Sequence, residues 1–420
     1  MKRFLCLFIA MVILLVGCTP SKTIQTKSLE VSEQLDTSEQ SEKYRTLLSP
    51  NNELSIVRKP AVADYSLINP GKMTELPSYN PDSDEFWQVD LRSSDLTNLD
   101  LSERINDLIY TDFDSKTQWP NKLPDGFDPQ IIMELGKNPG LRLRELHKKG
   151  VTGKGIGIAI IDQGLLVDHV EYREQLRLYE EIHCSDESAQ MHGPAVASIA
   201  VGKTVGVAPE ADLYYIAETH GVYKESCEFE WDLSWVAKSI DRIVEINKTL
   251  DEGKKIRVIS ISLGIGENMN GYEKALESIE KANHEGIHTI YVGSNEYMGL
   301  GRDPFKSADD VNSFTKGEFW KNWEYENERL LIPMDSRCTA SPTGVDDYVF
   351  YRKGGISWSV PYVAGLYALA CQVKPDITPD VFWEEAFETS DIIFVDNSSK
   401  EQLGKIVNPT RLIEKIEKIK

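Results

Sequence analysis

Four polar side chains stand at the ends of predicted secondary-structure elements: Asp162, His192, Asn295 and Ser357. Asp162 and Asn295 follow apolar runs typical of buried strands, whereas one helix is expected to begin at His192 and another near Ser357. In open parallel sheets, chemistry gathers beyond the carboxyl ends of the strands. A serine hydroxyl becomes a good nucleophile when a base takes its proton during attack, and histidine is the usual base. These residue types at these positions therefore indicate covalent catalysis by a serine.

The elements that would position these side chains alternate between strand and helix from about residue 129 onward. Near-continuous apolar runs, typical of strands buried on both faces, cover residues 155–161, 213–217, 258–263 and 287–292. Helices are predicted over 233–250, where apolar residues recur every three or four positions, and over 275–285. This alternation predicts an α/β fold with a mostly parallel central sheet flanked by helices.

Five motifs in this region resemble, in the same order, those of the subtilisin-like serine peptidases. They are the aspartate motif at 160–164, the histidine motif at 192–197, a Gly-Val-Ala-Pro connection at 206–209, a Ser-Leu-Gly at 262–264 and the serine motif at 355–365. The resemblance covers residues 129–412. One motif alone is weak evidence, but five in the right order argue against a chance match.

This resemblance implies a subtilisin-like three-layer domain and serine endopeptidase activity on polypeptide substrates. His192 would act as general base and then as general acid, Asp162 would orient its imidazole, and Ser357 would attack the peptide carbonyl. The backbone N–H of Ser357 and the side-chain amide of Asn295 would hold the oxyanion.

The resemblance also implies a substrate-binding strand. Ser262, Leu263 and Gly264 would pair with the substrate backbone, and Gly264 would leave room for a substrate side chain. This chemistry requires no cofactor. Calcium is compatible with the family as a structural ion, but no acidic cluster has a recognisable ligand spacing, so no metal ligand is assigned.

The sequence departs from the family pattern in three places. In place of the family's usual Gly-Thr-Ser-Met-Ala, this chain has Ile356 at the Thr position and the much bulkier Trp358 at the Met position. Around Asn295, only Asn-Glu matches the family motif in register. Residues 299–330 form an insertion that we expect to border the substrate cleft; a peripheral surface loop is the alternative. These departures keep a second function open, a catalytically silent subtilisin-fold lipoprotein that acts as a binding or regulatory module.

The N-terminus predicts export. Lys2 and Arg3 precede the apolar run 4–16, which is short for a membrane span but suits a signal peptide over 1–17. Cys18 then ends a segment that resembles the bacterial lipobox, in which the cysteine is diacylated, for example with palmitate. An ordinary signal peptide with an incidental cysteine is the alternative. We therefore expect a lipid-anchored protein on the extracytoplasmic face of a bacterial cell membrane.

The remaining domain boundaries follow from changes in amino-acid composition along the chain. Residues 18–60 are rich in Ser, Thr, Glu, Gln and Lys and predict a flexible tether. Residues 61–128 form a prefix of unknown fold, in which an Asp-Leu pair recurs at five-residue spacing, and residues 129–420 form the peptidase domain. The prefix has room for an inhibitory propeptide but no clear processing site. A removed propeptide and an intact, active anchored form both stay open.

Charge and cysteine content set further bounds. The net charge of −21 argues against a nucleic-acid partner, because phosphate binding needs a basic face. Four cysteines follow the anchor, at Cys184, Cys227, Cys338 and Cys371. They allow three disulfide pairings, and the sequence selects none of them. The sequence does not determine the oligomeric state.

Overall fold

The computed structural model describes residues 43–419 apart from 66–70, 84, 225–227, 321–323, 326–327 and 396–400. The predicted signal peptide, Cys18 and the first part of the predicted tether lie outside the described residues.

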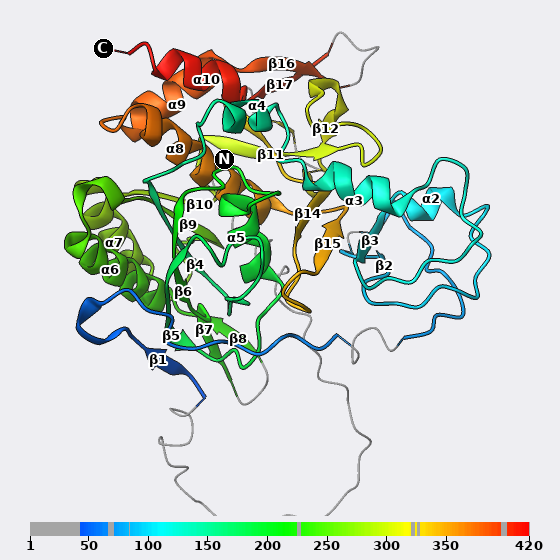
Figure 1. Ribbon diagram of the computed structural model, residues 1–420, viewed down its shortest axis with the longest axis horizontal. Helices are drawn as coiled ribbons and strands as arrows, with labels where there is room; N and C mark the ends of the chain where they lie inside the picture. The colour runs from blue at the N-terminus through cyan, green and yellow to red at the C-terminus, as the bar shows by residue number, and fades with distance from the viewer. Residues whose placement is uncertain are drawn as a thin grey trace, which may run out of the picture.

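A six-stranded sheet forms the centre of the molecule, with the strand order β1-β5-β6-β4-β9-β10 (Figure 1). Its strands are β1 Arg45–Leu47, β4 Gly157–Asp162, β5 Leu176–Cys184, β6 Asp212–Ala217, β9 Ile256–Gly264 and β10 His288–Val292. All neighbours pair in parallel except β1, which runs antiparallel to β5. The predicted α/β architecture and its four strands are confirmed, whereas β5 was not predicted.

Helices cover both faces of this sheet. Successive residues of β4 alternate between two cores: Ile158 and Ile160 face α5 His192–Val201 and α8 Ser359–Val373, while Ala159 and Ile161 face α6 Ser234–Thr249 and α7 Tyr272–His284. This alternation follows from the two-residue period of a strand. The three layers explain why the four predicted strands are mostly apolar on both faces.

One described helical segment, Ile356–Val373, is long and apolar enough to cross a membrane by length and composition. Within the molecule 78% of it is buried. Its apolar character is therefore accounted for by its place in the core, between the sheet and the C-terminal elements.

A second, five-stranded sheet lies beyond α8, with the order β12-β11-β13-β17-β16. Its strands are β11 Tyr297–Arg302, β12 Phe314–Lys316, β13 Leu330–Pro333, β16 Asp391–Phe394 and β17 Gln402–Ile406. Two helices, α9 Pro379–Glu388 and α10 Pro409–Ile416, contact each other beside it. The insertion at 299–330 contributes β12 and most of β11.

The prefix folds as a short stack of parallel turns of chain. β2 Val89–Asp90 pairs in parallel with β3 Thr111–Asp114, and isolated parallel bridges join Lys72 to Asp95 and Asp95 to Gln118. The leucines of the Asp-Leu repeat point into its core, with Leu91, Leu96 and Leu101 at most 2% exposed. The five-residue spacing therefore marks successive inward-facing positions.

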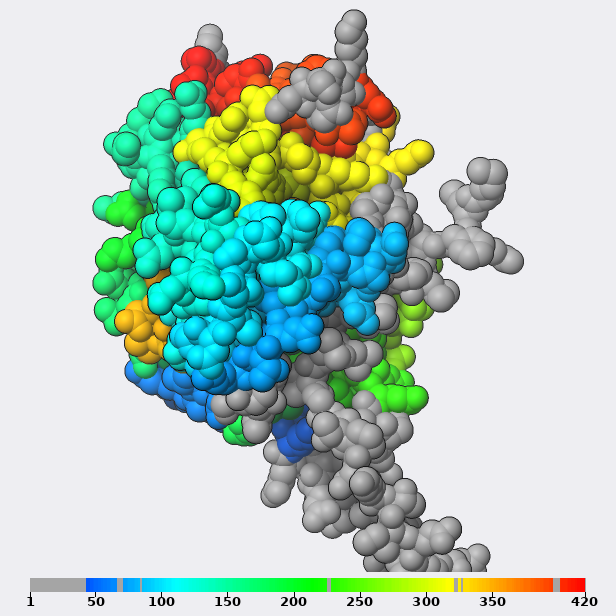
Figure 2. All heavy atoms as spheres, turned by 90° about the vertical axis from the view of Figure 1, so that its right-hand side faces the viewer, coloured from blue at the N-terminus to red at the C-terminus, as the bar shows by residue number. Residues whose placement is uncertain are grey.

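The prefix is joined to the rest of the chain by a shared sheet. β3 pairs antiparallel with β15 Tyr348–Tyr351, which pairs with β14 Arg337–Ala340. Two short helices, α3 Pro129–Lys137 and α4 Leu143–Lys148, follow the prefix, and α2 Ile105–Leu108 lies within it. In Figure 2 the prefix, in blue to cyan, lies directly against the insertion, in yellow; Phe86 and Phe319 make one of these contacts.

The predicted tether over 18–60 is wrong for its last part, residues 43–60. These residues form a strap along the outer edge of the sheet, where β1 pairs with β5 and Val57 N–H donates to the Tyr179 carbonyl. The strap also supplies Arg45 and Arg58 to the buried carboxylate of Glu181. Its composition resembles a linker because its stabilising contacts are main-chain pairs and ion pairs rather than apolar side chains.

Candidate active site

Asp162 and His192 meet at the carboxyl edge of the central sheet. β4 ends at Asp162 and α5 begins at His192, and the His192 Nδ1 atom lies 2.8 Å from Asp162 Oδ1 and 2.9 Å from Oδ2. Asp162 is 1% exposed, and its Oδ1 also accepts the Gln163 N–H at 2.8 Å. Because an ionised carboxylate only accepts, Nδ1 carries the hydrogen and Nε2 is left as the acceptor.

Ser357 lies in a 3-10 turn, Ile356–Trp358, directly before α8. The sequence placed it near a helix start, and α8 itself begins two residues later, at Ser359. The Ser357 hydroxyl donates to the Ser262 carbonyl at 3.3 Å, and the Ser262 hydroxyl donates to the Ser357 carbonyl at 2.9 Å. A hydroxyl can rotate, so a substrate that takes the Ser262 carbonyl would free Ser357 Oγ to donate elsewhere.

Neighbouring strands bring the remaining predicted site residues to the same edge. Ser262, Leu263 and Gly264 are the last residues of β9, and Gly264 is paired with Val292 of β10. Asn295 follows three residues later in the exposed turn between β10 and β11. Its Oδ1 accepts from Arg329 Nη2 at 3.2 Å, which leaves the amide N–H₂ free to point toward another acceptor.

Trp358, which replaces the Met of the family's usual serine motif, packs beside the histidine. Its indole is 2% exposed and packs against the His192 ring, with centroids 5.4 Å apart and planes at 56°. Gly354 makes room for it, since a Cβ there would approach the indole Cδ1 to 2.5 Å. The bulkier side chain thus fills space beside the histidine that a nearby glycine leaves open.

A second carboxylate–histidine pair lies behind Asp162. Glu218 follows β6 directly, its N–H donates to the Asp162 carbonyl at 2.8 Å, and its carboxylate contacts His220 Nδ1 closely. Burial disfavours the imidazolium of His220, but Glu218 outweighs that effect and raises the pKa above its usual value. The sequence analysis did not single out this pair, although polar residues after an apolar strand were the signal that found Asp162.

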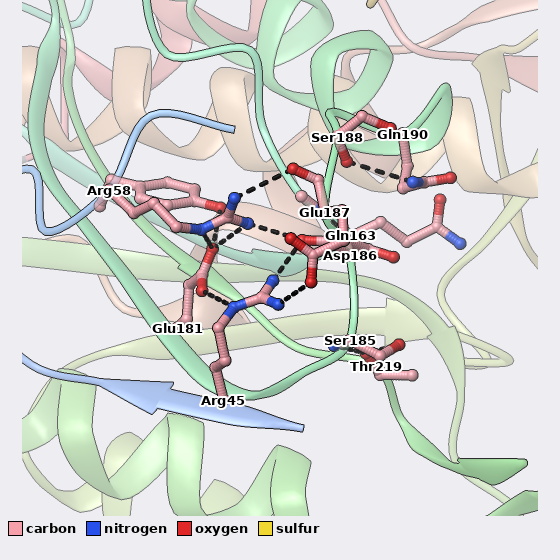
Figure 3. A network of polar contacts seen from close by, with 12 residues as sticks. Arg45, Arg58, Gln163, Glu181, Ser185, Asp186, Glu187, Ser188, Gln190 and Thr219 are labelled. Atoms are coloured by element: carbon pink, nitrogen blue, oxygen red, sulfur yellow. Dashed lines mark hydrogen bonds and ion pairs between the residues drawn. The ribbon is translucent and has the colours of Figure 1, made fainter. Parts of the chain in front are cut away.

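The loop before His192 is tied to the Asp162 motif and to the strap (Figure 3). Asp186 Oδ2 accepts the Gly164 N–H at 2.7 Å, and its backbone carbonyl accepts from Arg58 Nη2 at 2.6 Å and also from Arg45. Burial raises the pKa of the Asp186 carboxyl to about 6. The strap therefore supports the segment that leads into the histidine.

Across the part of the chain that the structure describes, no group of three or more His, Cys, Asp or Glu residues is placed to hold a metal ion. Cys184, Cys338 and Cys371 are buried, and none of these three forms a disulfide bond. Cys227 lies outside the described residues, so its pairing stays undetermined.

Part of the chain is similar in sequence to known proteases. The model of the subtilase family matches residues 153–304, a range that holds Asp162, His192, Ser262 to Gly264 and Asn295 but ends before Ser357. A subtilisin-like protease of Coccidioides posadasii (strain C735) is 27% identical over 238 residues, covering 54% of each chain. The major intracellular serine protease of Bacillus subtilis (strain 168) is 27% identical over 270 residues, covering 59% of this chain and 75% of its own.

The match spans about half the length of the first of these relatives. Among solved structures, the prenylagaramide maturation protease PagA is 17% identical and covers 66% of this chain and 98% of its own, with a TM-score of 0.47. Residues 153–304 thus match the subtilase family, and the chain is similar to subtilisin-like proteases at 27% identity.

Proposed function

We propose that the protein is a serine endopeptidase that hydrolyses polypeptides through an acyl-enzyme, with Asp162, His192 and Ser357 as its triad. The observation that carries the proposal is the Asp162–His192 pair, in which both carboxylate oxygens lie within 2.9 Å of Nδ1. This arrangement fixes the tautomer whose Nε2 can take a proton. The protease relatives support the same activity.

The reaction follows from these positions. A substrate strand pairs with residues 262–264, and Ser357 Oγ attacks the peptide carbonyl while His192 Nε2 takes the hydroxyl proton. The Asn295 amide and the Ser357 backbone N–H stabilise the oxyanion. The C–N bond then breaks as His192 gives the proton to the leaving amine. In the second half of the reaction His192 takes a proton from water as it attacks the ester, and then gives that proton to Ser357 Oγ as the C–O bond breaks.

Fluorophosphonate labelling tests the proposal. The protein that begins after Cys18 is treated with the reagent, and mass spectrometry locates the adduct. We expect an adduct on Ser357 that is absent in Ser357→Ala and present in Ser359→Ala, because the Ser359 hydroxyl is buried against the Pro333 carbonyl. Absence of any adduct in the wild-type protein would reject the peptidase and favour the silent binding module.

Membrane anchoring through Cys18 is part of the same proposal. It is supported by the basic residues Lys2 and Arg3, the apolar run 4–16 and the Gly17-Cys18 junction. Two acyl chains give stable attachment where one gives only marginal binding. In a bacterial host, Cys18→Ser should move the protein from the membrane fraction to the soluble extracytoplasmic fraction; unchanged partitioning would contradict the anchor.

A further inference from the structure

A continuous line of buried side chains connects the prefix to the His192 imidazole. It begins at Arg92 in the prefix, passes through Tyr351 at the end of β15 and continues through Trp358 to His192. Arg92, Tyr351 and Trp358 are 7%, 1% and 2% exposed. Such close packing leaves little freedom for any one ring to move alone.

The first link is made by the guanidinium of Arg92. Its Nη1 donates to Tyr351 Oη at 3.3 Å, and its Cζ lies 5.6 Å from the centre of the Tyr351 ring. Asp90 holds the other side of the guanidinium, with Nε and Nη2 at 2.8 and 2.7 Å from its carboxylate oxygens. Asp90 therefore fixes the orientation of the guanidinium that contacts Tyr351.

The second and third links are aromatic contacts. Tyr351 meets Trp358 edge to face, with centroids 5.5 Å apart and planes at 78°. Trp358 in turn packs against His192 at 5.4 Å. Packed aromatic rings prefer defined relative orientations, so Tyr351 restricts rotation of the Trp358 ring, and Trp358 restricts rotation of the His192 ring.

The main chain of the prefix is fixed on the same side. β3 pairs with β15 immediately before Tyr351, where Phe350 is opposite Phe113. Immediately after Tyr351, the Arg352 N–H donates to the Asp112 carboxylate at 2.7 Å. Both neighbours of Tyr351 are thus attached to the prefix. Removal of the prefix would therefore expose Phe350, which packs in the apolar cluster of the prefix, and Tyr351.

We propose that the prefix is a permanent part of the active enzyme, at least over its residues 71–127, and that Arg92, Tyr351 and Trp358 are positioning residues that hold the His192 imidazole. This inference rests on the peptidase function proposed above. Asp162 fixes one edge of the imidazole, and Trp358 limits rotation of its face. The orientation of the imidazole, and with it the direction of Nε2, is then set from both sides. A displacement of about 1 Å at a reacting group can cost about 10²-fold in rate, so such support affects turnover.

Trp358→Met, which restores the family's usual residue, is the first test variant. We expect kcat to fall by about 10- to 100-fold with KM within about twofold, because substrate contacts are kept while the base is misdirected. Trp358→Phe should restore part of the activity.

Arg92→Met tests the origin of the line in the prefix. We expect a fall in kcat in the same direction as for Trp358→Met, again with KM within about twofold. Arg104→Met is the matched control, since Arg104 also forms an ion pair within the prefix, with Asp107, and contacts the carbonyls of Leu76 and Pro77 rather than β15. It should lower stability while kcat and KM stay unchanged. Equal losses of kcat in Arg92→Met and Arg104→Met, or an unchanged kcat in Trp358→Met, would overturn the positioning role.

Retention of the prefix is tested on the labelled enzyme itself. Protein carrying the fluorophosphonate adduct is isolated by size exclusion under native conditions and analysed by mass spectrometry. We expect peptides from 71–127 in the labelled fraction in equal amount to those of the peptidase domain. Labelled protein that lacks them would overturn this inference while leaving the proposed function intact, whereas absence of an adduct on wild-type Ser357 would reject the function instead.

Discussion

Ser262 and Ser357 exchange two hydrogen bonds at the carboxyl end of β9. The Ser357 hydroxyl donates to the Ser262 carbonyl at 3.3 Å, and the Ser262 hydroxyl donates to the Ser357 carbonyl at 2.9 Å. The first bond is long and can be given up when a substrate arrives, whereas the second fixes the backbone that carries the nucleophile. The end of β9 therefore supports the turn before α8 and, in the proposed reaction, would also pair with the substrate strand.

Ser262→Ala should lower kcat/KM by about fivefold, because the loss of one hydrogen bond of about 1 kcal/mol loosens the Ser357 turn. Steady-state hydrolysis of a peptide substrate measures this. Ser260→Ala is the control, since Ser260 lies in the same strand and its buried hydroxyl has no hydrogen-bond partner among the described residues. A Ser260→Ala loss as large as that of Ser262→Ala would contradict the assignment.

Arg329 should act on catalysis through Asn295. The guanidinium holds Asn295 Oδ1 at 3.2 Å, so Arg329→Met should let the amide rotate and lower kcat by about tenfold. Asn295→Ala should cost about 10²–10³, the magnitude measured for an oxyanion donor in subtilisin. In the Asn295→Ala background, Arg329→Met should have no further effect on kcat. Additive losses would show that Arg329 acts independently.

The strap should contribute to stability through Glu181. Its carboxylate side chain is 0% exposed, and Arg58 lies 2.6 Å from it. Arg58→Met leaves the buried charge with one arginine fewer and should cost on the order of 2 kcal/mol of unfolding free energy, measured by urea denaturation. The neighbouring Lys59–Asp168 pair is exposed, so Lys59→Met should change stability by less than about 0.5 kcal/mol. Equal effects would argue against the strap as a structural edge.

Asp112 should make stability depend on pH. Burial, together with the nearby Asp90, raises the pKa of its carboxyl to about 8 from a usual 3.8. Between these values unfolding releases a proton, so the contribution to stability is full below about pH 4 and is lost as pH rises through about 8, by on the order of 1 kcal/mol per pH unit. Arg92 and Arg352 oppose this shift.

Asp112→Asn should remove that slope, and urea denaturation at pH 5 and pH 8 measures it. The exposed Asp125 provides the control, since Asp125→Asn should keep the wild-type slope. The same slope in Asp112→Asn would show that other groups determine the pH dependence.

The sequence by itself determined the elements whose patterns are local. The apolar runs predicted β4, β6, β9 and β10 because strands buried on both faces have few polar positions. Residues at their ends, Asp162 and Asn295, followed from the geometry of a parallel sheet. The helix starting at His192 was found in the same way.

Tertiary structure alone decided the contacts that join distant segments. β5 was missed because Glu180 and Glu181 interrupt its apolar pattern, and each is neutralised by arginines far away in the chain, Arg242 for Glu180 and Arg45 and Arg58 for Glu181. The line from Arg92 to His192 and the contact of Arg329 with Asn295 likewise join segments separated by insertions or by whole domains. An ion pair or a ring contact between such segments leaves no periodicity in either one, so only the folded chain reveals what holds the catalytic side chains in place.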